Sequence, residues 1–136
     1  FRSVKLLLDT STLVDILRGE QRVIERFRKA EPDTLLISAI SAGELMAGAA
    51  LSDDPHREQF AVDLLLRPLS AAPLDAATAR RAGILDTVLR KAGTPIGAAD
   101  RLIAATALEH DAVVVTSDTR DFLRVPFLTT ENWRTA

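Results

Sequence analysis

The sequence predicts an α/β fold in which a mostly parallel central sheet of about four to five strands is flanked by helices. Short apolar runs alternate with helical patterns along the chain, which is typical of parallel strands joined by crossover helices. The run Val113–Val115 is continuous and β-branched, as in strands that are buried on both faces of a sheet. The first run ends directly before Asp9. Ligands of such folds bind beyond the carboxyl ends of the strands, so Asp9 stands where a functional site is expected.

Four apolar runs are expected to be strands. The third should be short or lie at an edge of the sheet, because Pro68 and Pro73 flank it and proline cannot donate a hydrogen bond within a sheet. The expected strands cover residues 4–8, 35–38, 69–74 and 112–116. After the last of them we expect a turn over residues 117–121 and irregular or short extended structure over 122–128.

Helical patterns fill the segments between these runs. Gly19 is expected to end the first helix, Pro55 to break the chain between the third and fourth, and Asp75 to cap the fifth. The expected helices cover residues 13–18, 21–30, 41–50, 56–67, 76–92 and 98–109.

Length and composition indicate one globular domain, which we expect to span residues 1–136. The 17 basic and 19 acidic residues leave a net charge of −2, so no strongly basic average marks a polyanion binder. The sequence has no cysteine, which excludes disulfides and thiolate sites, and its two histidines are far apart, which disfavours zinc. No apolar run approaches the roughly 20 residues of a membrane span. We therefore expect a cytoplasmic protein that does not associate with membranes.

Four carboxylates from distant parts of the sequence are expected to meet at one edge of the sheet. Asp9 and Asp118 follow the first and last strands, and parallel strands end at the same edge. Asp100 opens the helix before the last strand, and Glu44 is expected in the first turn of the third helix. The amino terminus of a crossover helix lies at that same edge, so all four side chains can converge.

Carboxylates held close together repel one another unless a proton or a cation neutralises them. Oxygen ligands without sulfur or imidazole favour Mg²⁺, or Mn²⁺ as a substitute. Such a site can lower the pKa of a bound water and stabilise the attacking and leaving oxygens of a phosphodiester. The acidic residues therefore predict metal-dependent hydrolysis of nucleic acid.

Each acid also has a purely structural interpretation. Glu44 could complete a capping box with Ser41, and Asp100 could complement a helix dipole. Asp118 and Asp121 could be turn residues. Asp9, at the end of an apolar strand, is the hardest to explain in this way. Asp15, on the first helix, is expected to be solvated or to support the site indirectly.

Four motifs, in this order, resemble those of PIN-domain ribonucleases. Their length and spacing are similar to those of the VapC-type toxins of bacterial toxin–antitoxin pairs, and the resemblance covers nearly the whole chain. The motifs are Leu8-Asp9-Thr10-Ser11, Ile40-Ser41-x-x-Glu44-Leu45, Asp100-x-x-Ile103-Ala104-Ala105-x-Ala107 and Thr116-Ser117-Asp118-x-x-Asp121-Phe122.

The resemblance implies a PIN-like three-layer fold and a Mg²⁺-dependent endoribonuclease. It also implies a homodimer that is held inactive by a cognate antitoxin. The catalytic and metal-binding acids would be Asp9, Glu44, Asp100 and Asp118. Thr10 or Ser11 would orient Asp9 or a metal-bound water. Asp121 could share or take over the role of Asp118.

Alternative functions differ in how well the motifs fit them. A haloacid-dehalogenase-type phosphatase would need a second aspartate where Ser11 stands, and a receiver domain would need a lysine later than Lys91. A PIN-like nuclease that acts on DNA or on structured nucleic acid stays open, because its chemistry is the same. A non-catalytic RNA-binding PIN scaffold would be expected to lack one or more acids, and this sequence has all of them.

Overall fold

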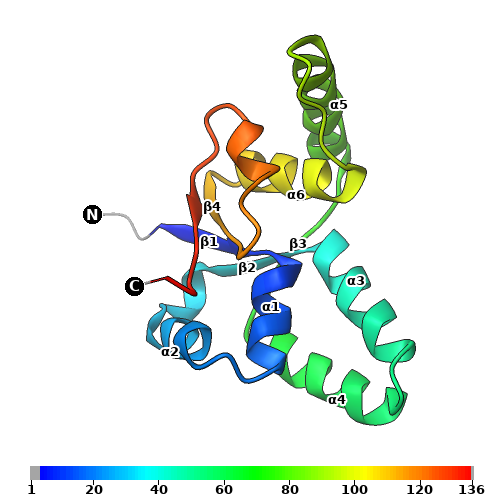
Figure 1. The fold of residues 1–136 in the computed structure, drawn as a ribbon, viewed down its shortest axis with the longest axis vertical. Helices are drawn as coiled ribbons and strands as arrows, with labels where there is room; N and C mark the ends of the chain where they lie inside the picture. The colour runs from blue at the N-terminus through cyan, green and yellow to red at the C-terminus, as the bar shows by residue number, and fades with distance from the viewer. Residues whose placement is uncertain (1–3, 136) are drawn as a thin grey trace.

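A computed structural model describes residues 4–135 and contains a single five-stranded sheet in which every pairing is parallel. The order of the strands is β3-β2-β1-β4-β5, so β1 lies at the centre of the sheet (Figure 1). The strands are β1 (Lys5–Leu8), β2 (Leu35–Ser38), β3 (Ser70–Ala72), β4 (Ala112–Val115) and β5 (Thr130–Glu131). The expected α/β class is confirmed, and β3 is a short edge strand, as the flanking prolines predict.

Six α-helices and two short 3-10 helices occupy the described chain, and the α-helices agree with the expected segments except near their ends. None of the helices within residues 4–135 is long and apolar enough to cross a membrane. The α-helices are α1 (Thr10–Leu17), α2 (Gln21–Lys29), α3 (Ala39–Ala50), α4 (Pro55–Leu66), α5 (Ala76–Lys91) and α6 (Ala98–Glu109). The 3-10 helices are η1 (Pro32–Thr34) and η2 (Phe122–Arg124).

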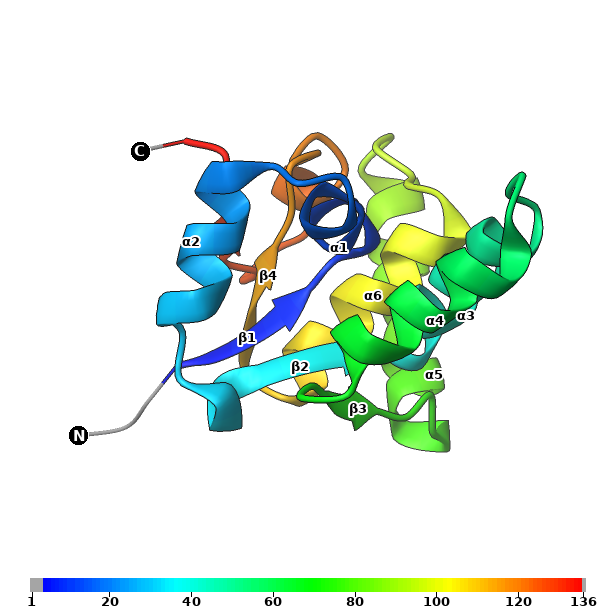
Figure 2. The ribbon, with the colours of Figure 1, turned by 90° about the horizontal axis from the view of Figure 1, so that it is seen from below.

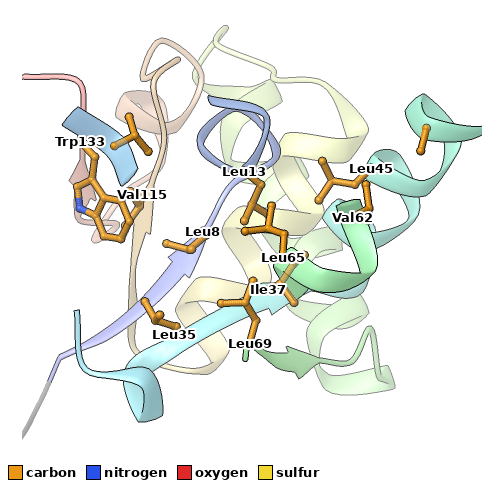
Figure 3. Packing of buried hydrophobic residues seen from close by; sticks show 12 residues of the cluster. Leu8, Leu13, Leu35, Ile37, Leu45, Val62, Leu65, Leu69, Val115 and Trp133 are labelled. Carbon is orange, nitrogen blue, oxygen red and sulfur yellow. The ribbon is translucent and has the colours of Figure 1, made fainter. Parts of the chain in front are cut away.

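Helices cover both faces of the sheet, which gives three layers and two hydrophobic cores (Figure 2). Successive side chains of β1 point to opposite faces, so Leu8 packs in one core and Leu7 in the other. The first core includes residues of α1 to α4 together with Trp133 (Figure 3). The second lies under α5 and α6. Burial on both faces fixes the sheet rigidly, and its carboxyl edge is therefore a firm base for a site.

Three expectations about the elements need correction. The first helix begins at Thr10, directly after Asp9, and not at residue 13 as expected. The third begins at Ala39, because the Ser38 side chain caps it by accepting a hydrogen bond from the Ser41 N–H at 3.0 Å. Glu44 consequently lies in the second turn of α3, and the capping-box interpretation fails. The sequence reading also missed β5, which is only two residues long.

Asp15 is not solvated. Its carboxylate is buried on α1, where Arg134 binds it through two hydrogen bonds, Nε to Oδ2 at 2.7 Å and Nη2 to Oδ1 at 2.6 Å. The Arg22 guanidinium donates in turn to the carbonyl oxygen of Arg134 at 3.1 Å. The end of the described chain is thus tied to α1, the helix that begins at Asp9.

Replacing Arg134 by Ala is expected to lower the melting temperature by several degrees, because it leaves the buried Asp15 carboxylate without its partner. Arg28→Ala, which removes an exposed arginine from α2, is the matched control and should change little. Adding Asp15→Asn to Arg134→Ala should recover part of the loss, since the uncompensated charge is then removed. Thermal unfolding of the four proteins tests this, and equal melting temperatures for Arg134→Ala and Arg28→Ala would contradict it.

Candidate active site

Asp9 is held at the centre of the carboxyl edge. Its N–H donates to the Val115 carbonyl oxygen at 2.9 Å, which continues the pairing of β1 with β4 by one residue. The same residue occupies the position before the first turn of α1, and its side chain is 6% exposed. Strand pairing and the start of the helix together fix this carboxylate.

Two hydroxyl groups hold one oxygen of the Asp9 carboxylate. Thr116 Oγ1 donates to Asp9 Oδ2 at 2.9 Å, and Ser11 Oγ donates to the same oxygen at 3.2 Å. Burial raises the pKa of Asp9, while these hydrogen bonds oppose the rise and the nearby charge of Glu44 adds to it. The Ser11 hydroxyl also accepts the Ser117 N–H at 3.1 Å. The first and fourth motifs of the sequence are therefore joined by direct hydrogen bonds.

Thr10 connects the first motif to the second. Its hydroxyl donates to Glu44 Oε1 at 2.7 Å, and its oxygen lies 3.0 Å from Ser41 Oγ. Glu44 is exposed on α3, and Thr10 directs its carboxylate toward the start of α1. The resemblance implied that Thr10 or Ser11 would orient Asp9 or a metal-bound water. In the structure Ser11 contacts Asp9 and Thr10 contacts Glu44.

Asp100 lies in the first turn of α6 and carries the most perturbed carboxyl group of the edge. Partial burial, a side-chain hydrogen bond with Asp121, and the negative charges of Asp9, Asp121 and Asp118 raise its pKa to about 7. A carboxyl group whose charge is opposed by its neighbours is a site that favours a cation.

Asp118 is paired with an arginine in the structure. Its two carboxylate oxygens face Arg120, with Nε 3.2 Å from Oδ1 and Nη2 3.3 Å from Oδ2. The hydrogen bond from Arg120 lowers the pKa of Asp118. Asp121, the alternative to Asp118, raises the pKa of Asp100 both through a side-chain hydrogen bond and through its charge.

The oxygen atoms at the carboxyl edge of the sheet are of the kind that bind a divalent metal ion. Carboxylate and hydroxyl oxygens surround Asp9 and Asp100, and both carboxyl pKa values are raised in a way that a cation would reverse. Within residues 4–135 no three carboxylate or imidazole side chains already stand close enough to enclose an ion. Binding a metal at this edge would therefore require side chains such as Glu44 or Asp118, both exposed, to rotate inward.

A groove runs from the site along α1, α3 and α4. Thr10 and Glu44 line the end that adjoins the acids, and Val14, Leu17 and Gly48 line its apolar length. Glu58, on α4, adds a second carboxylate to it. A ligand that lies in this groove can reach the acidic edge with one end.

The chain matches the family model of the PIN domain over residues 6–128. The chain belongs to the PIN-domain family. This PIN domain is 32% identical over 131 residues to the tRNA(fMet)-specific endonuclease VapC of Salmonella typhimurium, a match that covers 96% of this chain and 98% of that protein. It is 35% identical over 104 residues to ribonuclease VapC2 of Rickettsia felis, covering 76% of this chain and 78% of the relative.

The fold agrees with these relatives. The crystal structure of DNA-bound VapBC from Salmonella typhimurium matches this PIN domain with a TM-score of 0.90 at 32% identity, covering 96% of this chain and 99% of that one. Sequence and structure together identify a VapC-type PIN ribonuclease. The expected family and three-layer fold are thus confirmed.

The sequence reading of this PIN domain missed the role of Thr116, although its motif was recognised. The register of the sheet pairs Leu8 with Val115, so the next residues, Asp9 and Thr116, lie side by side at the edge. The hydroxyl of Thr116 was therefore the available signal, and it becomes informative only when the register of β1 and β4 is known.

Proposed function

We propose that this PIN domain is a Mg²⁺-dependent endoribonuclease toxin that a cognate antitoxin neutralises. The observation that carries the proposal is the Asp100 carboxyl group, whose pKa is raised to about 7 by burial and by neighbouring acids. Such a group at the carboxyl edge of a parallel sheet is where a cation would be bound. The VapC relatives, which are named ribonucleases, support the choice of reaction.

The metal would be held by carboxylates of Asp9, Glu44 and Asp100, with Asp118 or Asp121 as the fourth acid. When bound, the ion would activate a water and stabilise the charge that develops on the phosphodiester. Thr116 and Ser11 hold one oxygen of Asp9, and the backbone N–H of Thr10 also stabilises this carboxylate. Thr10 steers Glu44 toward the same edge.

Transfer RNA is the substrate class we propose to test first, because the Salmonella typhimurium relative is named a tRNA(fMet)-specific endonuclease. That relative is 32% identical over 96% of this chain. A VapC relative of comparable identity is named only a ribonuclease. Selectivity for one tRNA is therefore a question for experiment, and digestion of total RNA followed by mapping of the new ends would answer it.

The purified protein is expected to cleave RNA in Mg²⁺ or Mn²⁺ and to stop when EDTA removes the metal, because the acids would then repel the phosphodiester. The measurement is gel analysis of total tRNA and of a single-stranded DNA of similar length. Restored cleavage after excess Mg²⁺ is added back controls for damage by EDTA. Cleavage that persists in EDTA would contradict the metal mechanism, and cleavage of DNA alone would favour the rival nuclease.

The partner follows from the same relatives. The Salmonella typhimurium structure is described as DNA-bound VapBC, a complex of toxin and antitoxin, and we propose that this chain has a cognate antitoxin as well. The apolar groove beside Glu44 is the surface we assign to it. A homodimer and a cytoplasmic location remain expectations, which gel filtration with light scattering and cell fractionation would test.

A further inference from the structure

Arg120 stands at the rim of the acidic site, on the loop that joins β4 to η2. Its guanidinium group forms a two-pronged pair with the Asp118 carboxylate, at 3.2 Å and 3.3 Å. Both side chains face solvent, with 86% of the arginine and 59% of the aspartate exposed. The negative charge of Asp121, the next residue, also raises the pKa of the Arg120 guanidinium group.

The backbone beneath Arg120 is fixed to the site. The Asp118 N–H donates to Thr116 Oγ1 at 3.0 Å, and this hydroxyl oxygen is 2.9 Å from Asp9 Oδ2. The Ser117 N–H donates to Ser11 Oγ at 3.1 Å. Arg120 therefore extends from a loop that is hydrogen-bonded to Asp9 and to Ser11. The charge of Arg120 is held close to the place where RNA would be cut.

The pair with Asp118 does not explain why an arginine is present. An exposed ion pair between residues two apart stabilises a fold very little, because solvent screens it. The guanidinium fork, however, matches a phosphate as well as it matches a carboxylate. A site made of acids repels RNA, so a cation at its rim would offset that repulsion.

We propose that Arg120 binds a backbone phosphate of the RNA and positions the strand over the acids, and that this phosphate displaces the carboxylate of Asp118. The inference rests on the proposed ribonuclease function. In the free protein the Asp118 carboxylate pairs with the Arg120 guanidinium group and takes the place of the phosphate. When RNA binds, the exposed Asp118 side chain is released beside Asp9 and Asp100, where a further acid could join the site.

Equilibrium binding of fluorescein-labelled total tRNA in EDTA, followed by anisotropy over a series of salt concentrations, tests the exchange without cleavage. Arg120→Ala is expected to weaken binding about tenfold and to reduce the salt slope by about 0.7 log units, as the loss of one phosphate contact to a single strand does. Arg80→Ala, which removes an exposed arginine from α5, is the control and should keep the slope. An Arg120→Ala slope equal to that of wild type would overturn the proposal.

Asp118→Asn distinguishes displacement of the Asp118 carboxylate from Arg120 by the phosphate from simple repulsion of RNA by the Asp118 charge. It should tighten RNA binding about threefold in the presence of Arg120, because the competing carboxylate is gone, and clearly less in the Arg120→Ala background. An equal gain in both backgrounds would show that Asp118 acts only as a repelling charge, which overturns the exchange.

Steady-state cleavage separates this inference from the function on which it rests. Arg120→Ala should raise KM about tenfold and change kcat less than about threefold, since a phosphate contact at the rim is made equally in the ground and transition states. If wild type cleaves tRNA and Arg120→Ala behaves like Arg80→Ala, the inference fails and the nuclease stands. If wild type neither binds nor cleaves RNA, both fail.

Discussion

Replacing Asp100 by Asn should reduce RNA cleavage by at least about 100-fold, because changes to groups that merely support metal ligands already cost about 10- to 100-fold. In metal-free protein the same change should raise the melting temperature by a few degrees. The cause is that burial and the negative charges of nearby acids disfavour the charged form of Asp100, which the protein must nevertheless carry at high pH. The neighbouring acids are Asp9, Asp121 and Asp118. Loss of activity with gain of stability is the signature of a residue that serves the site and not the fold.

The pH dependence has a definite sign. The pKa of Asp100 rises from 3.8 in the unfolded chain to about 7 in the folded protein, so the folded state holds a proton that the unfolded state releases. The stability that this bound proton contributes is therefore fully present below pH 3.8 and is lost as the pH rises through about 7. Because the group is only partly buried, we expect a fall of roughly 1–2 kcal/mol after solvent screening. Asp100→Asn removes this fall, so its advantage should grow from pH 5 to pH 8.

Asp63→Asn, the same chemical change at an exposed position of α4, is the control and should alter neither cleavage nor the melting temperature. Thermal unfolding with added Mg²⁺ provides a second readout. The metal should stabilise wild type by mass action and leave Asp100→Asn unchanged. A variant that melts lower than wild type and still cleaves RNA would show that Asp100 is a structural residue of α6.

The sequence predicted the sheet and its carboxyl edge because both depend on local patterns. Buried parallel strands are continuous apolar runs, and Asp9 follows the most central of them. Element ends were less predictable, since α3 begins directly after β2, at Ala39, and only Asp9 separates β1 from α1, which begins at Thr10. The strand β5 is two residues long, and its existence depends on pairing with β4, which no local pattern reveals.

Side-chain partners within the site could not be read from the sequence for a similar reason. Which oxygen of Asp9 is held, and by which hydroxyl, depends on the register of β1 against β4. The pairing of Asp118 with Arg120 is local, but the sequence alone does not show that the loop turns both side chains outward. The burial of Asp15 was not predicted because its partner, Arg134, is near the other end of the chain.

Filling the groove beside Glu44 is expected to have the second large effect, which is the loss of antitoxin binding. The sequence predicts that an antitoxin lies against the first helix, around residues 13–17, and the helix after Glu44, and that Leu13→Glu or Met46→Glu weakens the complex. Leu13 is fully buried in the core under α1, so Leu13→Glu would unfold the protein and test nothing. Val14 and Leu17 are the apolar residues of α1 that line the groove.

Gly48 is the better position, because it lines the groove on α3 and a Cβ atom added there meets no other atom within 4 Å. Tryptophan at Gly48 would fill the space an apolar partner segment needs, and glycine is a poorer helix former than tryptophan, so α3 should not suffer. Gly83 on α5 also has open space around its Cβ position, which makes Gly83→Trp the matched control.

Gly48→Trp is expected to weaken the complex with the antitoxin at least about 100-fold, since a filled groove removes the buried centre of the interface where binding energy concentrates. The protein encoded beside this chain should rescue growth when it is co-expressed with wild type or Gly83→Trp, and fail to rescue Gly48→Trp. Purified Gly48→Trp should melt as high as wild type and still cleave tRNA, which separates loss of control from loss of fold. Equal rescue of all three proteins would remove the groove from the interface. If the neighbouring product does not bind even wild type, the antitoxin assignment fails and the nuclease assignment is unaffected, because cleavage depends on the acids and not on the groove.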